Sequence, residues 1–213
     1  MMTMRGFSVL AFCCVLLAVL SPVAVLHAAG GADPEWPCIQ RKVPEITAGV
    51  VWTGPQFSDK DRSWQKVPAV ADMVTRLSQR RLALDDAKRL IDDFATGLGA
   101  QKNLQLTSLF AGLLQTINRE RREIMAGIGR YAKKQLALAE KINTTRHEFN
   151  AVLSKAELSA EDEKRRDALE EQLSWDTRIF DERQQSLTYV CESPVLLEQR
   201  LFALGRQILQ HVE

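Results

Sequence analysis

The chain has 213 residues, with 28 Lys and Arg against 27 Asp and Glu, so its formal net charge is only +1. A balanced charge creates no general field for nucleic acid or an acidic membrane, so either partner would need a local patch. The most basic stretch holds Arg119, Arg121, Arg122, Arg130, Lys133 and Lys134, diluted by acidic neighbours and with one aromatic residue, Tyr131. We interpret it as a solvated helix face and expect no nucleic-acid partner.

Residues 1–29 have the layout of a cleavable secretory signal. Arg5 precedes an apolar run at 7–20, and small residues follow at 28–30. The run is short for a membrane span, although the apolar residues at 23–26 lengthen it, so a retained anchor is the alternative. We expect cleavage, a periplasmic or secreted location and no stable membrane insertion afterwards.

Two cysteines would remain after cleavage, Cys38 and Cys191, because Cys13 and Cys14 lie inside the signal. Two cysteines in an exported protein are most simply one disulfide. An intermolecular bridge and a pair of free thiols in a redox or metal site are the alternatives. A redox motif would separate the cysteines by only two residues, and a zinc site would need further ligands nearby. We therefore predict an intramolecular Cys38–Cys191 disulfide.

Residues 30–66 form an N-terminal arm rich in proline and tryptophan. Its prolines forbid a long helix, and residues 46–52 could form one short extended segment. The arm also holds Trp36, Trp52 and Trp64. We expect these tryptophans to pack on the helices that follow, because Trp brings a large apolar area to any contact. A tryptophan-lined sugar or peptide site is the alternative.

Part of the arm resembles a known group of sequences. Trp36-Pro37-Cys38-Ile39-Gln40-Arg41-Lys42-Val43-Pro44, followed by Val51-Trp52-Thr53-Gly54-Pro55, resembles the start of uncharacterised exported proteins from proteobacteria. The resemblance covers about twenty residues. It implies a periplasmic location and no known activity.

Residues 67–213 are expected to form a helical domain that begins with two short helices. The apolar face of the first holds Val70, Met73, Val74 and Leu77, and that of the second holds Leu84, Ala87, Leu90, Ile91 and Phe94. Pro68 suits the first turn of one helix, and Gly97 marks the end of the other. Each helix is apolar on one side only, so both need a surface to pack on.

That surface is a long antiparallel helical hairpin predicted at about 104–191, which makes the fold class all-α and coiled-coil-like. The heptad seam of its first helix comprises Phe110, Leu114, Ile117, Arg121, Ile124, Ile128, Tyr131, Gln135, Leu138, Ile142, Thr145, Phe149 and Val152. The returning helix carries Leu169, Leu173, Phe180, Leu187 and Val190, interrupted by Asp176 and Arg183. A repeat of about 3.5 residues keeps one narrow stripe facing a partner helix.

The two ends of the returning helix have recognisable signals. Ser159 resembles an N-cap, which places the hairpin turn between Lys155 and Ala160. Ser193-Pro194 is expected to end or kink the helix, because proline removes a backbone donor, and a last helix would follow.

The densely charged run at 161–171 should form an exposed tip of the hairpin, with ion pairs three and four residues apart. Arg165 and Arg166 are our candidates there for binding a partner.

The polar seam residues Arg121, Gln135, Thr145, Asp176 and Arg183 support two interpretations. In a hairpin, buried polar groups set the register of the helices. In a compact bundle, they could line a cavity for a small ligand.

The sequence contains no phosphate-cradling glycine loop, no paired-cysteine metal module and no spacing typical of a nucleophilic site. His147, near Glu148 and Asn143, lacks the several carboxylates and paired histidines of a helical metal site, so we interpret it as solvated. We therefore predict no catalytic residue, no metal and no cofactor.

The expected function is that of a non-enzymatic helical binding or scaffolding protein with a protein partner in the cell envelope, and self-association is compatible with it. The alternative is a helical bundle that binds a small ligand or a metal. An enzyme comes last.

Overall fold

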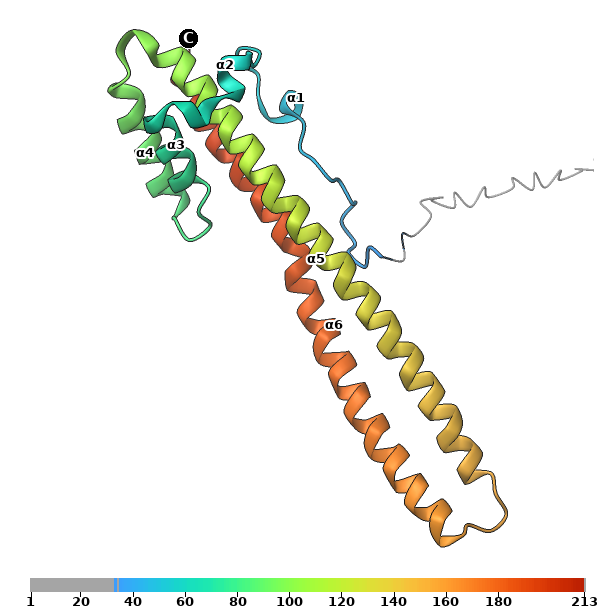
Figure 1. Cartoon of the computed structure of the whole chain (residues 1–213). Helices are drawn as coiled ribbons and strands as arrows, with labels where there is room; N and C mark the ends of the chain where they lie inside the picture. Colours follow the sequence, from blue (N-terminus) through green and yellow to red (C-terminus); the bar gives the residue numbers. More distant parts are fainter. Residues whose placement is uncertain (1–32, 34, 213) are drawn as a thin grey trace, which may run out of the picture. The chain divides into compact units, whose positions relative to one another are not determined.

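The computed structural model describes residue 33 and residues 35–212, so the predicted signal at 1–29 lies outside the described residues. The described part is all-α, as predicted, and contains no strand. Two long helices, α5 (Lys102–Leu153) and α6 (Ala160–Leu209), form an antiparallel hairpin (Figure 1). None of the described helices combines the length and the apolar character that crossing a membrane requires.

We divide residues 46–212 into two parts. The base (residues 46–120 and 195–212) contains the short helices and the adjoining ends of α5 and α6, and the stalk (residues 121–194) contains the rest of the hairpin. The base contains α3 (Pro68–Leu77) and α4 (Leu84–Thr96), which pack on α5 and α6 through the predicted apolar faces. Its largest fully buried side chains are Leu77, Ile91, Leu106, Leu109, Phe110, Leu113, Ile117, Leu197, Leu201, Leu204 and Ile208. The hydrophobic core of the described residues therefore lies mainly at one end of the hairpin.

Arg200 joins the helices of the base. From α6 it donates to the carbonyl oxygens of Leu77 and Leu82, at 3.0 and 2.9 Å. The last carbonyls of a helix have no donor within the helix, so this side chain completes the C-terminal end of α3. Burial lowers the pKa of Arg200.

The arm differs from the prediction at residues 46–52, where the extended segment is wrong. The structure has a short helix, α1 (Ala48–Val51), followed by α2 (Asp59–Arg62) and the 3₁₀ turn η1 (Trp64–Lys66). A single extended segment has no neighbouring strand to pair its backbone, whereas in α1 the N–H of Trp52 donates to the Ala48 carbonyl at 2.8 Å. The helical turn also buries two consecutive side chains, Val51 and Trp52, which an alternating strand would place on opposite faces.

The hairpin turn lies where it was predicted. After the 3₁₀ turn η2 (Gly99–Gln101), α5 runs without interruption to Leu153, and α6 starts at Ala160. Ser159 is the N-cap: its hydroxyl accepts from the Asp162 N–H at 3.1 Å, and the Asp162 carboxylate accepts from the Ser159 N–H at 3.2 Å. This capping box satisfies two backbone donors at the start of α6.

The prediction of a separate last helix after Pro194 is wrong, because α6 continues through Pro194 to Leu209. Proline in a helix interior costs about 3 kcal/mol, since it lacks a backbone N–H and crowds the preceding turn. The residues that follow offset this cost: Leu197, Leu201 and Leu204 are fully buried in the core of the base. Their burial, at about 1.5–3 kcal/mol for each side chain, keeps the helix continuous.

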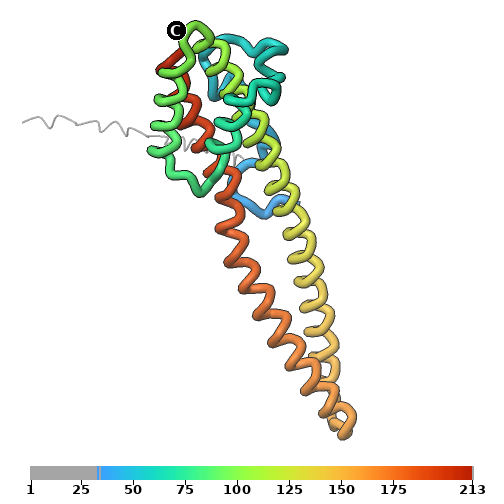
Figure 2. Tube along the Cα trace, turned by 60° about the vertical axis from the view of Figure 1, so that its left-hand side comes forward, coloured from blue at the N-terminus to red at the C-terminus, as the bar shows by residue number. Residues whose placement is uncertain are grey.

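The stalk consists of α5 and α6 side by side, with the arm beside its upper part (Figure 2). The predicted seam of α5 is buried or half-buried along its whole length. On α6, Leu169 and Leu187 are buried as predicted, but Val190 is 41% exposed and Cys191 is buried instead. The difference is confined to this position, where Cys191 is bonded to Cys38 of the arm, because Pro194, seven residues after Leu187, is again buried.

Candidate functional site

The polar seam of the stalk aligns the two long helices. Three side chains of α5 donate to backbone carbonyl oxygens of α6: Arg121 Nε to Pro194 at 3.2 Å, Tyr131 Oη to Arg183 at 3.0 Å, and Gln135 Nε2 to Phe180 at 3.1 Å. Sliding one helix along the other would break all three bonds at once. The buried polar groups therefore fix the register, and these three donate to the backbone of α6 rather than to a ligand cavity.

Asp176 adds an ion pair to the same seam. Asp176 is only 5% exposed, and its carboxylate lies 2.8 Å from the Nζ atom of Lys141 on α5. Thr145 bonds within its own helix, to the Lys141 carbonyl at 2.9 Å. Opposite charge and fixed distance make this pair a second constraint on register in the distal half of the stalk.

Arg121 was assigned both to the seam and to the solvated basic stretch, and at 3% exposed it belongs to the seam, as the heptad predicted, and not to the basic face. Burial lowers the pKa of Arg121, and Glu198, 3.5 Å away, partly offsets this effect. The other members of the basic stretch are exposed or half-exposed, and two of them pair with the arm: Arg122 with Glu45 at 2.5 Å and Lys133 with Glu35 at 2.9 Å. The stretch therefore holds the arm in place.

Replacing Gln135 with Leu is expected to raise the free energy of unfolding by about 1 kcal/mol. The buried Oε1 atom of Gln135 has no hydrogen-bond partner, and an unsatisfied buried polar atom costs about 1–3 kcal/mol. The Phe180 carbonyl keeps its bond within α6 after the change. Urea unfolding measures the difference, and Gln135→Ala, which leaves a cavity, should lower stability instead. A loss of stability in the Leu variant would mean that the amide holds the seam together.

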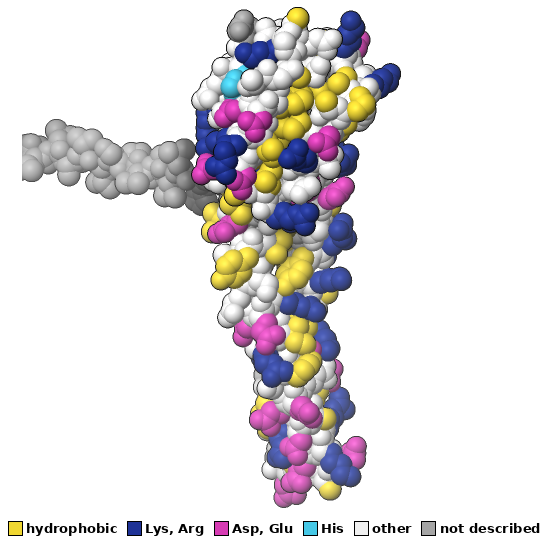
Figure 3. Space-filling view, turned by 90° about the vertical axis from the view of Figure 1, so that its left-hand side faces the viewer, with side chains coloured by type: hydrophobic (Ala, Val, Ile, Leu, Met, Phe, Trp, Pro, Cys, Tyr) yellow, Lys and Arg dark blue, Asp and Glu magenta, His cyan; other side chains and the backbone are white. Residues whose placement is uncertain are grey.

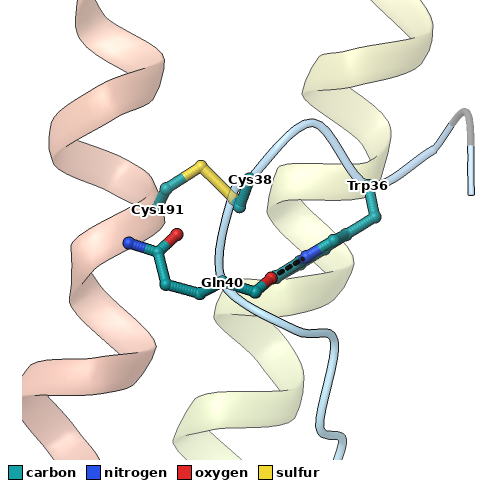
Figure 4. Close-up of a disulfide and its surroundings, with 4 residues drawn as sticks. All are labelled: Trp36, Cys38, Gln40 and Cys191. Carbon is teal, nitrogen blue, oxygen red and sulfur yellow. Dashed lines mark hydrogen bonds between the residues drawn. A yellow bond between two sulfur atoms is a disulfide. The ribbon is translucent and has the colours of Figure 1, made fainter. Parts of the chain in front are cut away.

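The Cys38–Cys191 disulfide is present as predicted, with 2.01 Å between the sulfur atoms and 5.5 Å between the Cα atoms. An intermolecular bridge and two free thiols are therefore not what the structure shows. Near the bridge, the Trp36 indole N–H donates to the Gln40 carbonyl at 2.6 Å (Figure 4). This bond closes a compact loop of the arm around Cys38.

The arm runs along α5 in the opposite direction. Beyond the disulfide it is held by Asn118, whose side-chain amide donates to the Ile46 carbonyl and accepts from the Ile46 N–H, both at 2.9 Å. Glu35 of the arm lies beside Gly129, where a Cβ atom would be in ordinary contact with the Glu35 carbonyl oxygen at 3.6 Å. The disulfide and these contacts fasten the arm across the junction of base and stalk.

At the tip, Arg165 and Arg166 are on the surface but engaged. Arg165 Nη2 lies 3.3 Å from the Glu148 carboxylate of α5, and Arg166 donates twice to Asp167, at 2.9 and 2.7 Å. The hydrogen bonds and charge of Asp167 raise the pKa of Arg166. Their side chains are 61% and 33% exposed. The structure brings the two residues to adjacent positions, and neither faces an enclosed pocket.

The turn itself is also tied by charge. Lys155 bonds to Asp162, and this bond together with the Ser159 hydroxyl lowers the pKa of Asp162 to about 2. The carboxylate is therefore ionised at any physiological pH. The tip is a charged, solvated surface whose shape the capping box defines.

The arm tryptophans do not form a common binding surface. Trp52 is 7% exposed and stacks on Phe110 with 4.4 Å between ring centroids, while Trp64 is 9% exposed and donates to Gln115 at 2.8 Å. They pack on the helices, as predicted. Trp36 lies apart from them, at the disulfide.

The two histidines of the described residues lie apart: His147 is exposed on α5, and the Nε2 atom of His211 is 2.6 Å from Asp92. His211 and Gln207 together lower the pKa of Asp92. Within residues 35–212, no group of three or more His, Cys, Asp or Glu side chains has the arrangement of a metal site.

One surface feature was missed by the sequence interpretation. Trp175 on α6 is 56% exposed, and the Arg178 guanidinium lies over its ring at 4.4 Å. The two side chains border a surface hollow of about 490 Å³ whose lining comes from α6 alone. The available signal was its position, because Trp175 falls off the predicted seam of the returning helix.

Comparison with known proteins identifies no relative of this chain. The chain matches no protein-family model. Searches among curated protein sequences and among solved structures find no similar protein either. The seam, the arm and the tip are therefore interpreted from their own chemistry.

Proposed function

We propose that the protein is a non-enzymatic helical binding or scaffolding protein that works in the periplasm or outside the cell. The observation that carries the proposal is the stalk. Its 33 residues of α5, 121–153, extend about 50 Å from the base at 1.5 Å per residue. Four polar contacts keep its helices in one register. A long, aligned hairpin presents surface at a distance from its own core, which suits binding or spacing.

Two features support an exported location. The Cys38–Cys191 bridge would persist in an oxidising compartment and would be reduced in most cytosols. The N-terminal sequence has the charge and apolar pattern of a secretory signal. The proposed partner is therefore a protein of the cell envelope.

The tip is the proposed contact, with Arg165 and Arg166 meeting acidic groups of the partner. Exposed ion pairs such as Arg165 with Glu148 contribute about 0–1 kcal/mol to stability, so a competing carboxylate can replace them. Binding of this kind is salt-sensitive, because exposed charges are screened over about 8–10 Å at physiological ionic strength.

Reversing both charges, Arg165→Glu with Arg166→Glu, is expected to lower the capture of envelope proteins severalfold while changing the free energy of unfolding by less than about 0.5 kcal/mol. Capture on immobilised protein, at low and high salt and read by mass spectrometry, measures the effect. The matched control is Arg76→Glu with Arg89→Glu, which makes the same change in charge at exposed positions of the base.

Equal capture by the parent and the tip variant would remove Arg165 and Arg166 from the proposal. Equal loss in the tip variant and the base variant would mean that net charge, rather than the tip, governs the capture.

A further inference from the structure

A second apolar stripe runs along the outside of α6. Its members are Ala168, Trp175, Ile179, Tyr189 and Leu196, and we call them the outer stripe. They are separated by 7, 4, 10 and 7 residues, which are sums of the 3 and 4 of a heptad repeat. Trp175, Tyr189 and Leu196 are 56%, 77% and 58% exposed. The period that pairs α6 with α5 is thus repeated on a face of α6 that no other described element buries.

The outer stripe continues a face that is covered in the base. Arg200 lies four residues after Leu196 and bonds to the α3 end and the loop before α4, at the carbonyls of Leu77 and Leu82. Helices α3 and α4 therefore cover this side of the hairpin in the base and stop where the stalk begins. Below them, hydrophobic side chains recur among charged ones down the stalk (Figure 3). The bare face is the natural place for a further pair of helices.

The face is large enough for a stable interface. From residue 168 to residue 196 it is about 42 Å long, at 1.5 Å per residue, and two helices side by side are about 20 Å wide. This area, about 800 Å², equals what each partner buries in a typical specific complex.

Its charges are self-complementary. On the α5 side of the face, Lys134 follows Tyr131 by three residues and Lys141 follows Lys134 by seven, and on the α6 side lie Glu171 and Glu182. Glu182 also lies 3.9 Å from Arg178 of its own helix, an exposed pair that a cation of the partner can replace. The Tyr131–Arg183 and Gln135–Phe180 bonds put Lys134 level with Glu182 along the stalk. A two-fold axis parallel to the hairpin would place α5 of one copy against α6 of the other. Lys134 of each copy would then meet Glu182 of its partner.

We propose that two copies of the chain pair through the outer stripe into a symmetric dimer with both tips at the same end. The partner we propose is a second copy of the chain. A two-fold interface uses the same surface on both copies, so that surface must complement itself, and a face with Lys on one helix level with Glu on the other does so. Trp175 and Tyr189 are the anchors, since large aromatic side chains dominate the energy of such interfaces. The proposal is independent of what the tip binds.

The mass of the purified protein in solution, followed by sedimentation equilibrium over a concentration series, tests the dimer. The parent should show twice the mass of one chain. Trp175→Glu should raise the dissociation constant about 30-fold or more, as loss of an aromatic anchor does. Leu136→Glu is the matched control: Leu136 is 54% exposed, but follows Gly129 by seven residues, on the side that holds the arm. It should leave the mass unchanged.

A charge exchange tests the orientation. Lys134→Glu and Glu182→Lys should each raise the dissociation constant about tenfold, and the double variant should restore parental affinity. Unchanged circular dichroism would show that every variant is folded. A monomeric parent, an equal loss in Trp175→Glu and Leu136→Glu, or an additive loss in the double variant would overturn the proposal. The first of these results would leave the stripe to a helix of a different protein.

Discussion

Replacing Phe110 with Ala is expected to lower the free energy of unfolding by about 3–5 kcal/mol, the range for removing a large aromatic side chain from a well-packed core. Phe110 is completely buried and stacks on Trp52, and Phe57 lies 6.1 Å from its ring. It also fills the space beside Gly205, where a Cβ atom would lie 2.8 Å from the ring. One side chain thus joins the arm, α5 and α6.

Guanidinium unfolding followed by helix circular dichroism and by tryptophan fluorescence measures this loss. The fluorescence should report it most directly, because Trp52 loses its stacking partner. Leu136→Ala, at a 54% exposed position of the same helix, should change stability by less than about 0.5 kcal/mol. Equal effects of the two substitutions would mean that the base is not the main source of stability.

Replacing Cys38 and Cys191 with Ser together is expected to cost about 2–5 kcal/mol. The bridge joins residues 153 apart, and the chain-entropy model assigns about 5 kcal/mol to so long a loop as an upper value. Reduction of the parent should produce the same loss. In protein that lacks residues 1–29, and with them Cys13 and Cys14, intact mass after alkylation should show modified thiols only when a reductant has been added.

The two parts of the molecule should respond differently to loss of the bridge. Proteolysis within residues 35–45 should become faster, because this part of the arm is then held to the helices by its ion pairs and by the neighbouring contact of Ile46 with Asn118. Helix content should be nearly unchanged, since the core of the base and the polar seam do not involve the cysteines. A parental unfolding midpoint in the Ser variant would contradict the role given to the bridge.

Local chemistry made the hairpin predictable. A heptad repeat from Phe110 to Val152 is typical of a helix that pairs with a second helix along its length. Ser159 caps the returning helix through a contact with a residue only three positions away, so its role can be predicted locally. The same holds for Cys38 and Cys191, where the count of cysteines after the predicted signal left one simple pairing.

The candidate site was predicted less completely. The positions of Arg165 and Arg166 on an exposed tip follow from the charged run, but their engagement with Glu148 and Asp167 depends on rotamers that no sequence pattern specifies. The outer stripe was overlooked because its apolar residues are widely spaced among polar ones; Trp175 lies off the predicted seam, but the exposure of Trp175 and Tyr189 is what shows that their face is uncovered.

The sequence alone determined that two long helices pair, where the chain turns between them and which cysteines bond, because each depends on periodicity, a local cap or a count. Tertiary structure decided three other matters. It kept α6 continuous through Pro194, since burial of the following leucines outweighs a lost hydrogen bond. It made α1 a helix, since no strand was available to pair with it. It chose the partners of Arg121, since the heptad places this side chain in the seam but does not specify that the Pro194 carbonyl and Glu198 of α6 meet it there.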